Sequence, residues 1–495
     1  MVSYLSSVDQ SIINLLPSDE SLSPRELARM SRRRALFRMA NGFGGLSLCA
    51  LASCSSESQP QLIGGAASGG KRAKNVIYLY MSGGPSQIDT FDPKPRLAKE
   101  HGQEMKLKIP PIQFNGANLV MQSPFKFKRY GESGIDVSEI FPNVAKCVDD
   151  MCVVRSMVAD HGEHGTANLF MNTGSALRGR PSMGAWINYG LGSESEDLPG
   201  YVVLESGRIP LGGLACFGSG FLPARHQGTV FRRGSYPVED IQPREPVSEI
   251  QQAKLSLIEG LNRDSLEQFG SNDMLDAVVE NYELAFRMQS SVPDLVDFRD
   301  ESSTTIEAYG VNDSATEDFG SQCLIARRLV ERGVRFVQLL PPRIKGLDLW
   351  DQHRQLRMGH EKNAHATDKP IAALLQDLKA RGMLDETLVI WGGEFGRTPM
   401  QHTMPANFSD RDGRGHNRYG FTMWLAGGGV KPGCVYGATD EYGMFAVENP
   451  VHVHDMHATI LHLLGINHEE LTFKHGGREF RLTDVYGKVV HDIVA

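Results

Sequence analysis

The sequence predicts an α/β fold in which a central, mostly parallel sheet is sandwiched between helices. Short apolar runs that are typical of buried strands recur along the chain, and the segment between two of them carries apolar residues at the spacing of one helical face. Strand, helix and strand in that order form a crossover unit, which is nearly always right-handed and parallel. In such a sheet ligands bind beyond the carboxyl ends of the strands, so polar side chains that follow the strands are the candidates for a site.

The composition is that of a globular chain with a large core. The chain has 495 residues, of which 41% are hydrophobic and 22% are charged, and both values are ordinary for a soluble protein. The length exceeds that of a usual single domain. The formal net charge of -8 argues against a nucleic-acid partner, because a general nucleic-acid binder needs a basic surface.

Residues 1–53 are interpreted as an N-terminal extension with a twin-arginine export signal. Arg33 and Arg34 precede a weakly apolar stretch that is too short to span a bilayer, which predicts export to the periplasm or cell envelope. Cys54 follows in a context similar to a bacterial lipobox, which predicts membrane attachment through a lipidated cysteine; the alternative is an ordinary small residue at a non-lipid cleavage site. The extension before the arginines is unusually long, so we expect Met30 to be the true start.

Residues 54–74 are rich in Ser, Gln, Gly and Ala and predict a flexible linker, so the folded domain is expected at 75–495. Cys147 and Cys152 are a possible bridge in an exported protein, although the cysteine spacing does not indicate a disulfide scaffold.

The first predicted strand, residues 75–81, is followed by a glycine turn with two carboxylates, Asp89 and Asp92. Either acid alone would be interpreted as a turn-former. Because the turn lies at the mouth of a sheet strand, Asp89 is predicted to be a site residue.

A helix near 137–149 leads to a second strand at 151–157, and His161 and His164 follow it in a Gly-rich turn. Neutral imidazole is a common metal ligand and proton carrier, so both histidines are candidates. Thr166 could be a nucleophile at a helix start, where the helix dipole would stabilise an alkoxide; the alternative is a helix cap.

Residues 180–320 are interpreted as insertions that shape a substrate cleft, with a strand-like run at 200–204 and a helical run at 274–289. A helix at 319–332 and a strand at 335–340 then return the chain to the core.

The crossover helix is predicted over 366–378, with Asp368 as its N-cap and Pro370 in its first turn, and a strand at 387–391 follows it.

Acidic and imidazole side chains follow both strands of this crossover unit. Asp351 and His353 follow the first strand and Glu394 follows the second, so all three are expected to converge on one crevice and bind metal. Arg397 suits a tetrahedral anion through bidentate hydrogen bonds; a salt bridge that fixes the loop is the alternative.

His416 is the third imidazole candidate and precedes a strand predicted at 421–426. The last helix is expected to be capped by Asp455 and ended by Gly465. Its histidines, and those at 360 and 365, are five residues apart, which does not match a zinc-protease helix, so they are assigned to packing and surface.

Several motifs make the chain resemble a family catalogued as domain of unknown function 1501, within the alkaline-phosphatase and sulfatase superfamily. The motifs are Gly83-Gly84-Pro85-Ser86 with Asp89-Thr90-Phe91-Asp92, Trp350-Asp351-Gln352-His353, Gly393-Glu394-Phe395-Gly396-Arg397-Thr398-Pro399, Gly413-Arg414-Gly415-His416-Asn417, and Asp455-Met456-His457-Ala458-Thr459-Ile460. The resemblance runs from about residue 75 to the C-terminus. The leader is similar to that of exported planctomycete-type members.

The resemblance implies an alkaline-phosphatase-like or sulfatase-like fold with two divalent metal ions at the strand ends. Asp351, His353, Glu394 and His416 then look like metal ligands, and Asp89 or Ser86 replaces the acid after the first strand. Oxygen and nitrogen ligands without thiolate allow zinc, manganese, magnesium or calcium.

Three departures from the superfamily pattern bear on catalysis. Ser82 stands about where alkaline phosphatases have an Asp, and Gly415 stands where an Asp usually precedes the His. The Cys-x-Pro-x-Arg sequence of true sulfatases does not occur.

The leading hypothesis is an exported metal-dependent hydrolase of phosphate or sulfate esters, acting on a small-molecule or glycan ester. Its catalytic candidates are Thr166, His161, His164 and Arg397. The alternative is a catalytically silent, envelope-anchored binding protein that keeps the fold.

Overall fold

The protein is described by a computed structural model that covers residues 73–110, 118–238, 241, 248–269, 273–402 and 412–495. Contacts divide the chain into two units, Met1–Gln61 and Leu62–Ala495, and all the described residues belong to the second. The predicted leader, linker and lipidated Cys54 lie outside the described residues.

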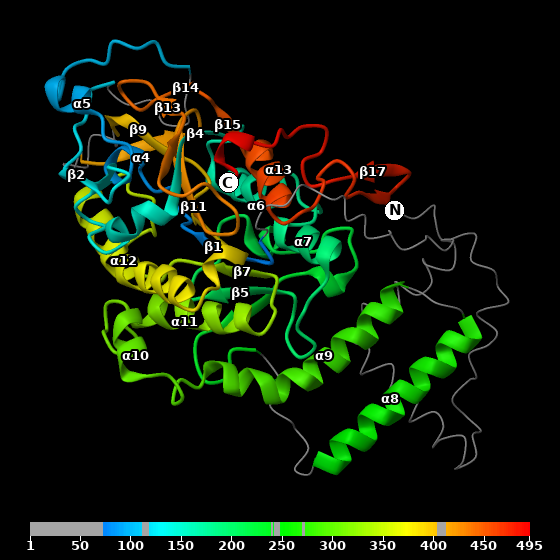
Figure 1. Ribbon diagram of the computed structural model, residues 1–495. Coiled ribbons are helices and arrows are strands. Elements are labelled where there is room, and N and C mark those ends of the chain that lie inside the picture. The colour runs from blue at the N-terminus through cyan, green and yellow to red at the C-terminus, as the bar shows by residue number, and fades with distance from the viewer. Residues whose placement is uncertain (1–72, 111–117, 239–240, 242–247, 270–272, 403–411) are drawn as a thin grey trace, which may run out of the picture. The chain divides into compact units, whose positions relative to one another are not determined.

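The second unit is built on a nine-stranded sheet with the strand order β12-β4-β11-β8-β1-β7-β5-β6, in which β15 also pairs with β4 (Figure 1). Only β11 runs antiparallel to its neighbours, β4 and β8, and the other pairs of this sheet are parallel. The predicted α/β class with a mostly parallel central sheet is therefore confirmed. The strands are β1 (Asn75–Tyr80), β4 (Met151–Val158), β5 (Tyr201–Glu205), β6 (Thr229–Arg232), β7 (Phe336–Leu339), β8 (Thr387–Gly392), β11 (Phe421–Ala426), β12 (Cys434–Tyr436) and β15 (Val451–His452).

Both faces of the sheet are covered, which explains why its strands read as continuous apolar runs rather than as alternating ones. Along β1, Ile77 and Leu79 enter the hydrophobic core on one face, whereas Val76 and Tyr78 enter the core on the other. The register Val76↔Phe336 and Val76↔Leu388 places β1 between β7 and β8.

Helices form a layer on each face of the sheet (Figure 1). Leu324 of α11 and Leu374 of α12 pack into one core, and Phe170 of α6, Trp186 of α7 and Ile460 of α13 pack into the other. The helices are α4 (Gln87–Thr90), α5 (Pro95–Lys99), α6 (His164–Thr173), α7 (Met183–Leu191), α8 (Ser248–Phe269), α9 (Asp273–Val296), α10 (Ser303–Tyr309), α11 (Glu317–Glu331), α12 (Leu356–Ala380) and α13 (Val453–Leu463).

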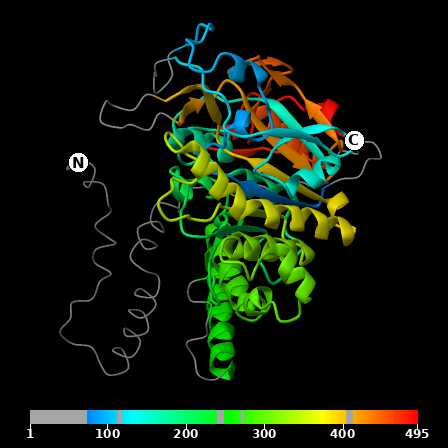
Figure 2. The same cartoon turned by 90° about the vertical axis from the view of Figure 1, so that its left-hand side faces the viewer.

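Smaller elements complete the unit. α8 and α9 run alongside each other in Figure 1 and overlap in the turned view of Figure 2, and the amide of Gln251 donates to that of Gln289 at 2.6 Å. Four two-stranded sheets pair β2 (Phe127–Tyr130) with β3 (Ile135–Ser138), β9 (Gly396–Gln401) with β10 (Arg414–Asn417), β13 (Ala438–Thr439) with β14 (Ala446–Glu448), and β16 (Phe473–His475) with β17 (Arg478–Phe480). The 3-10 helices are η1 (Val144–Asp150), η2 (Gly213–Cys216), η3 (Ala224–His226), η4 (Leu384–Glu386) and η5 (His491–Ile493).

The crossover helix begins earlier than the sequence predicts. α12 starts at Leu356, so Pro370 lies inside it and Asp368 is not its N-cap. The Asp368 carboxylate instead accepts hydrogen bonds from the backbone N–H groups of Asn143 and Val144, which begin η1. Asp368 is therefore a capping residue, as predicted, but it caps η1 and not α12. The sequence around Asp368 could not show this, because Asn143 and Val144 are more than two hundred residues away in the chain.

Three other predictions differ from the structure. The region predicted as a helix near 137–149 begins with β3 and continues as the shorter helix η1. In α13 the N-cap is His452, and Asp455 occupies the third position of a capping box. The segment 180–320 also contributes β5 and β6 to the central sheet, so part of it belongs to the core.

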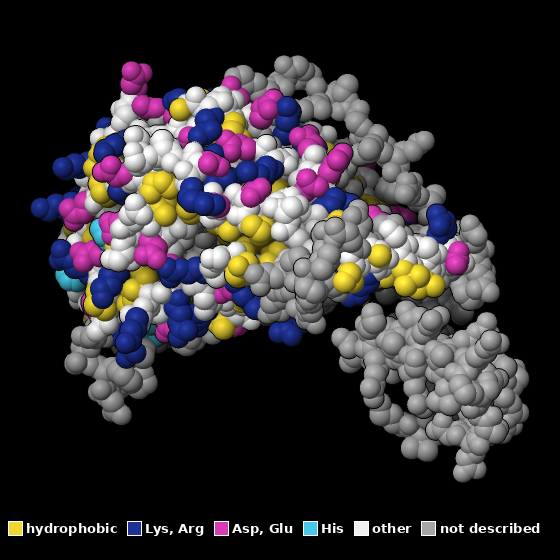
Figure 3. Space-filling view, turned by 90° about the horizontal axis from the view of Figure 1, so that it is seen from below, with side chains coloured by type: hydrophobic (Ala, Val, Ile, Leu, Met, Phe, Trp, Pro, Cys, Tyr) yellow, Lys and Arg dark blue, Asp and Glu magenta, His cyan; other side chains and the backbone are white. Residues whose placement is uncertain are grey.

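The surface carries mixed charge. On the face drawn in Figure 3, Lys and Arg side chains are interspersed with Asp and Glu side chains, without a large area of one sign. No helix among the described residues is long and apolar enough to cross a membrane.

Candidate metal centre

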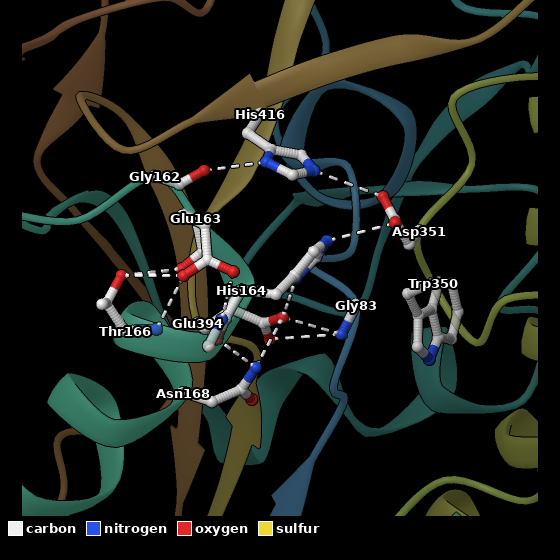
Figure 4. Close-up of polar contacts among 12 residues, drawn as sticks. Gly83, Gly162, Glu163, His164, Thr166, Asn168, Trp350, Asp351, Glu394 and His416 are labelled. Carbon is white, nitrogen blue, oxygen red and sulfur yellow. Dashed lines mark hydrogen bonds and ion pairs between the residues drawn. The ribbon is translucent and has the colours of Figure 1, made fainter. Parts of the chain in front are cut away.

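Four of the predicted site residues meet at the carboxyl-end edge of the sheet. His164 is the first residue of α6, directly after the loop that follows β4, and Asp351 and His353 lie in the segment after β7. His416 comes from β10 and approaches from the opposite side of the cluster (Figure 4). Residues far apart in sequence are therefore brought together by the ends of the strands, as expected.

Three imidazoles direct their Nε2 atoms at one carboxylate. The Nε2 atom of His164 lies 3.2 Å from Oδ2 of Asp351, and the Nε2 atoms of His353 and His416 lie 3.1 Å and 3.4 Å from Oδ1. The Nε2 atoms of His353 and His416 are 3.0 Å apart. His164, Asp351 and His416 each offer a ligand atom within 4.8 Å of the others, which makes them a group able to hold a metal ion.

The outer nitrogens of two of these rings are fixed by other groups. Nδ1 of His164 lies 2.6 Å from Oε1 of Glu394, and Nδ1 of His416 lies 2.7 Å from the carbonyl oxygen of Gly162 (Figure 4). A carboxylate and a carbonyl are acceptors, so each ring carries a proton on Nδ1 and presents Nε2 to the cluster. Metal-binding histidines are generally oriented in this way.

The donor set fits a divalent metal ion. The Nε2 atom of His164 is buried and has no hydrogen-bond partner of good geometry among the described residues, although Asp351 lies near. Ligand nitrogens about 2.0–2.1 Å from a tetrahedral zinc ion would be about 3.3 Å apart, close to the separations seen in the cluster. Imidazole with carboxylate suits zinc and manganese better than calcium, which prefers oxygen.

Electrostatics give the members of the cluster different proton affinities. Burial by itself lowers the pKa of His164, but its contacts with the carboxylates of Asp351 and Glu394 outweigh burial and raise the pKa to about 9. Burial lowers the pKa of His416 to about 3. Burial of Asp351 opposes its ionisation, yet the Arg397 guanidinium and the imidazoles hold the pKa of that carboxyl far below its usual range.

Arg397 is fully occupied by the protein. Its guanidinium donates to Oδ1 of Asp351 at 2.6 Å and to the carbonyl oxygen of Gly84 at 2.9 Å, and further donors reach the carbonyls of Gly83, Trp350 and Arg414. The side chain is completely buried. The structure therefore favours the salt bridge that fixes the loop over an anion clamp.

Glu394 stands behind the cluster. Its carboxylate contacts Nδ1 of His164 and accepts the backbone N–H of Gly83 at 3.0 Å, and its side chain is fully buried. In this geometry Glu394 contacts His164 and Gly83 rather than the group around Asp351, and its predicted role as a metal ligand stays a prediction.

Asp89 is not part of the cluster. It forms a fully buried ion pair with Arg414, with Nε 2.7 Å from Oδ2 and Nη2 3.2 Å from Oδ1, and it also accepts the hydroxyl of Ser86. Burial alone would raise the pKa of Asp89, but the guanidinium holds it below its ordinary value. Both carboxylate oxygens are used, so the expected ligand role has no support in this geometry.

Thr166 and His161 lie beside the cluster. The Thr166 hydroxyl is 3.1 Å from Oε2 of Glu163, and Glu163 is the N-cap of α6, accepting the backbone N–H groups of Gly165 and Thr166 (Figure 4). The His161 ring packs edge-on against Phe170, with centroids 5.2 Å apart. Neither side chain joins the group that gathers around Asp351.

A cavity of about 120 Å³ opens next to His164 and Asp351 and is also lined by Ser82, Asn168 and Arg208. Asn168 donates to the carbonyl of His164 at 2.6 Å and accepts the hydroxyl of Tyr80. Three larger cavities, two of about 530 Å³ and one of about 610 Å³, are lined by none of the predicted site residues.

Arg208 and Asn168 were missed by the sequence analysis. Arg208 follows β5 by three residues, so the strand-end signal that found the histidines would have found it too, had 200–204 been interpreted as a strand of the central sheet. Nothing in the sequence marks Asn168, which is one helical turn beyond His164.

Comparisons with known proteins are consistent with the expected family. A family model described as protein of unknown function, DUF1501, matches residues 73–494. The chain is similar to a sulfatase from Pseudoalteromonas sp. (13% identity over 80% of this chain and 69% of that chain, TM-score 0.34). It is also similar to the alkaline phosphatase of the Antarctic bacterium TAB5 (12% identity, 80% of this chain and 99% of that chain, TM-score 0.32). A phosphonate monoester hydrolase from Silicibacter pomeroyi is similar over 66% of this chain and 68% of that chain, with 12% identity and a TM-score of 0.29. None of the curated proteins matches the sequence.

Proposed function

The chain belongs to the family described as protein of unknown function DUF1501, and we propose that it is a metal-dependent hydrolase of phosphate or sulfate esters. One observation carries the proposal: three imidazole Nε2 atoms lie within 3.4 Å of the oxygens of one carboxylate, Asp351. Imidazole nitrogens gathered around one carboxylate, with further groups that fix the orientation of the rings, are the arrangement that a catalytic metal site needs.

The ligands that we propose are Asp351, His164 and His416, with His353 as a fourth. Arg397 donates to Oδ1 of Asp351 and directs the remaining lone pairs of that carboxylate toward the imidazoles. A divalent ion held there would supply Lewis acidity, polarising an ester oxygen and lowering the pKa of a water molecule. The described residues provide one such group, so the proposal requires one ion, and the second ion that the family resemblance implies is not needed for it.

The cavity beside these ligands suits the anionic end of an ester. Arg208 lines it, and its guanidinium is held 3.0 Å from Oδ1 of Asp348, an exposed residue that also lines the cavity. A guanidinium binds tetrahedral oxyanions through paired hydrogen bonds. We therefore assign anion binding to Arg208, which lines the cavity, instead of Arg397, which the sequence had suggested.

Thr166 remains the candidate for a protein nucleophile, with Glu163 as its base. The hydroxyl and the carboxylate are 3.1 Å apart at the N-terminus of α6. A carboxylate at that distance can remove the hydroxyl proton, and the helix end stabilises the resulting negative charge. If Thr166 plays no part, the nucleophile is water.

The position of Thr166 also favours the alternative function, a binding protein without turnover. The residues that line the cavity include His164 and Asn168 but not Thr166. In this alternative the metal centre and Arg208 hold a sulfated or phosphorylated glycan without cleaving it.

A metal and turnover assay tests both functions. Protein freed of metal by chelation would be titrated with zinc, manganese, magnesium and calcium, and then assayed with aryl phosphate and aryl sulfate esters. We expect the wild type to bind an ion and to hydrolyse one ester, and Asp351→Asn and His416→Ala to lose both properties. His365→Ala, an exposed histidine outside the cluster, should retain them. Metal binding without turnover of either ester supports the binding protein, and absence of metal binding refutes both functions.

We also propose that the protein is exported by the twin-arginine route and anchored in the cell envelope through Cys54. The support is the sequence of residues 33–54, which lie outside the described residues. Fractionation of cells that express the chain, with Arg33→Lys and Arg34→Lys together as the export-defective control and Cys54→Ala as the control for the anchor, tests this. Cytoplasmic accumulation of the unaltered chain would refute it.

A further inference from the structure

Two cysteines face each other across a parallel strand pair at the edge of the central sheet. Cys434 of β12 is the direct partner of Cys152 of β4, and their Sγ atoms are 3.0 Å apart. Adjacent strands lie about 4.8 Å apart, which is inside the range of about 4.4–6.8 Å that a disulfide spans between Cα atoms. Both residues are thiols in the structure. The sequence had suggested Cys147 as the partner of Cys152, but Cys147 lies in η1, with its Sγ 3.8 Å from Nε2 of Gln376.

The two thiols differ in their access to solvent. Cys152 is completely buried, whereas Cys434 lies on an edge strand and is partly exposed. The Sγ atom of Cys434 also lies 3.3 Å from the carbonyl oxygen of Lys431. A reagent from solvent therefore reaches Cys434 first, with Cys152 directly behind it.

We propose that Cys152 and Cys434 are a thiol pair that closes to a reversible intrachain disulfide when it meets a small-molecule disulfide. The Cys434 thiolate attacks one sulfur of the reagent, whose other half leaves as a thiolate and takes up the released proton. The Cys152 thiolate then attacks Sγ of Cys434 and expels the second half. Two protein thiols are oxidised and one reagent disulfide is reduced to two thiols, so atoms and electrons balance.

The acidities of the two thiols support this order of attack. The hydrogen bond between them lowers the pKa of the Cys434 thiol and raises that of the Cys152 thiol. The thiolate is the nucleophile in disulfide exchange, so the exposed member of the pair is also the more reactive one.

The bridge would fasten the C-terminal segment to the sheet. The residues just before Cys434 pair with the end of the chain: the N–H of Lys431 donates to the carbonyl of Ile493 at 2.9 Å, and Ala495 donates to Gly429 at 2.9 Å. A disulfide between Cys152 and Cys434 closes a loop of most of the domain, and closing a long loop restricts the unfolded chain strongly. Oxidation should therefore raise the thermal midpoint by several degrees.

The proposal is independent of the metal centre, because neither cysteine lines the cavity beside His164. The test uses the full chain, first reduced and then equilibrated with mixtures of reduced and oxidised glutathione, alkylated, and mapped by mass spectrometry. We expect a peptide cross-linked through Cys152 and Cys434 under oxidising mixtures, its loss under reducing ones, and a higher thermal midpoint for the oxidised form.

Variants separate the two steps. Cys152→Ser should stop at a glutathione adduct on Cys434, and Cys434→Ser should give neither adduct nor cross-link. Cys323→Ser, a buried cysteine on α11, should form the bridge as the wild type does. If Cys434→Ser folds poorly, Cys434→Ala replaces it. A wild-type chain that keeps both thiols free in oxidised glutathione, or joins Cys152 to another cysteine, overturns the proposal.

Discussion

The Nδ1 atom of His164 lies 2.6 Å from Oε1 of Glu394, and this contact determines which nitrogen of the ring faces Asp351. The N–H of Gly83 holds the same carboxylate at 3.0 Å, so the strand end of β1, the loop after β8 and the start of α6 are joined at one point.

Glu394→Gln should weaken metal binding while leaving the fold intact. An amide oxygen still accepts from Nδ1 of His164, but without a charge it makes the ring a poorer donor to a metal, and loss of such a partner typically costs 10–100-fold in affinity. Calorimetric titration of metal-free protein measures the effect. Glu361→Gln, on an exposed pair with Arg357, is the control. Equal affinities for the two variants would contradict the positioning role.

Gly83→Ala should displace the segment that carries Asp351. Gly83 has a φ of +107°, and a Cβ there would lie 2.6 Å from the backbone N of Trp350 and 2.8 Å from that of Asp351. We expect a stability loss of about 1–3 kcal/mol and a large drop in metal affinity. Gly102→Ala is a matched control, because Gly102 has a φ of +75° with open space around it. If Gly102→Ala also lost metal affinity, the effect of Gly83→Ala could not be attributed to displacement of Asp351.

Arg208→Ala should raise KM for an anionic ester about tenfold or more, with a smaller effect on kcat and none on metal affinity. Its guanidinium lines the cavity but does not contact the cluster around Asp351. Asp348→Asn should have the opposite effect on KM, because it frees Arg208 from its present partner. Steady-state kinetics with Arg343→Ala, an exposed arginine, as control measure both. If turnover is absent, direct binding of inorganic phosphate or sulfate replaces the kinetics.

Arg414→Met should destabilise the fold by about 3–5 kcal/mol, because it leaves the buried carboxylate of Asp89 without its cation. Urea unfolding measures the loss, and Arg357→Met, on an exposed pair, should cost less than about 1 kcal/mol. Asp89→Asn should bind as much metal as the wild type. A lower metal content for folded Asp89→Asn would restore Asp89 as a ligand.

Acid should destabilise the protein between about pH 6.5 and pH 4 through buried neutral histidines. Burial lowers the pKa of His226 to about 4 and that of His457 to about 3. Below the unfolded pKa of about 6.5, each of these histidines is protonated in the unfolded chain but stays neutral in the folded chain. The free energy of unfolding therefore decreases as pH falls, by about 2 kcal/mol for each histidine at pH 5. His226→Phe should flatten the dependence of the urea midpoint on pH, and exposed His365→Phe should not.

Much of the fold could be predicted because its strands are buried on both faces. The strands that became β1, β4, β7, β8 and β11 were placed to within a residue or two from apolar runs alone. The antiparallel direction of β11 could not be predicted, because an apolar run carries no information about its direction. Nor could the start of α12, where Gln355 adopts a φ of 51° and its N–H is held by Asp412.

The candidate site, too, could be predicted only in part from the sequence. Asp351, His353, His164 and His416 were found because they follow strands or lie near them, and parallel strands bring their ends together. The place of Asp89, on helix α4, depends on Arg414, which is 325 residues away in the chain and lies on β10. Ion pairs between such distant residues depend on tertiary packing. The sequence alone therefore could not distinguish a carboxylate that is free to bind a metal ion from one that is already paired with an arginine.

The ribbon of β9 and β10 carries both Arg397 and His416, which are direct partners in its register. The cation that orients Asp351 and one of the imidazoles that faces it therefore travel on a single arm. Any change in the position of this ribbon would therefore move both side chains together, so the two contacts with Asp351 depend on the seating of one hairpin-like pair of strands.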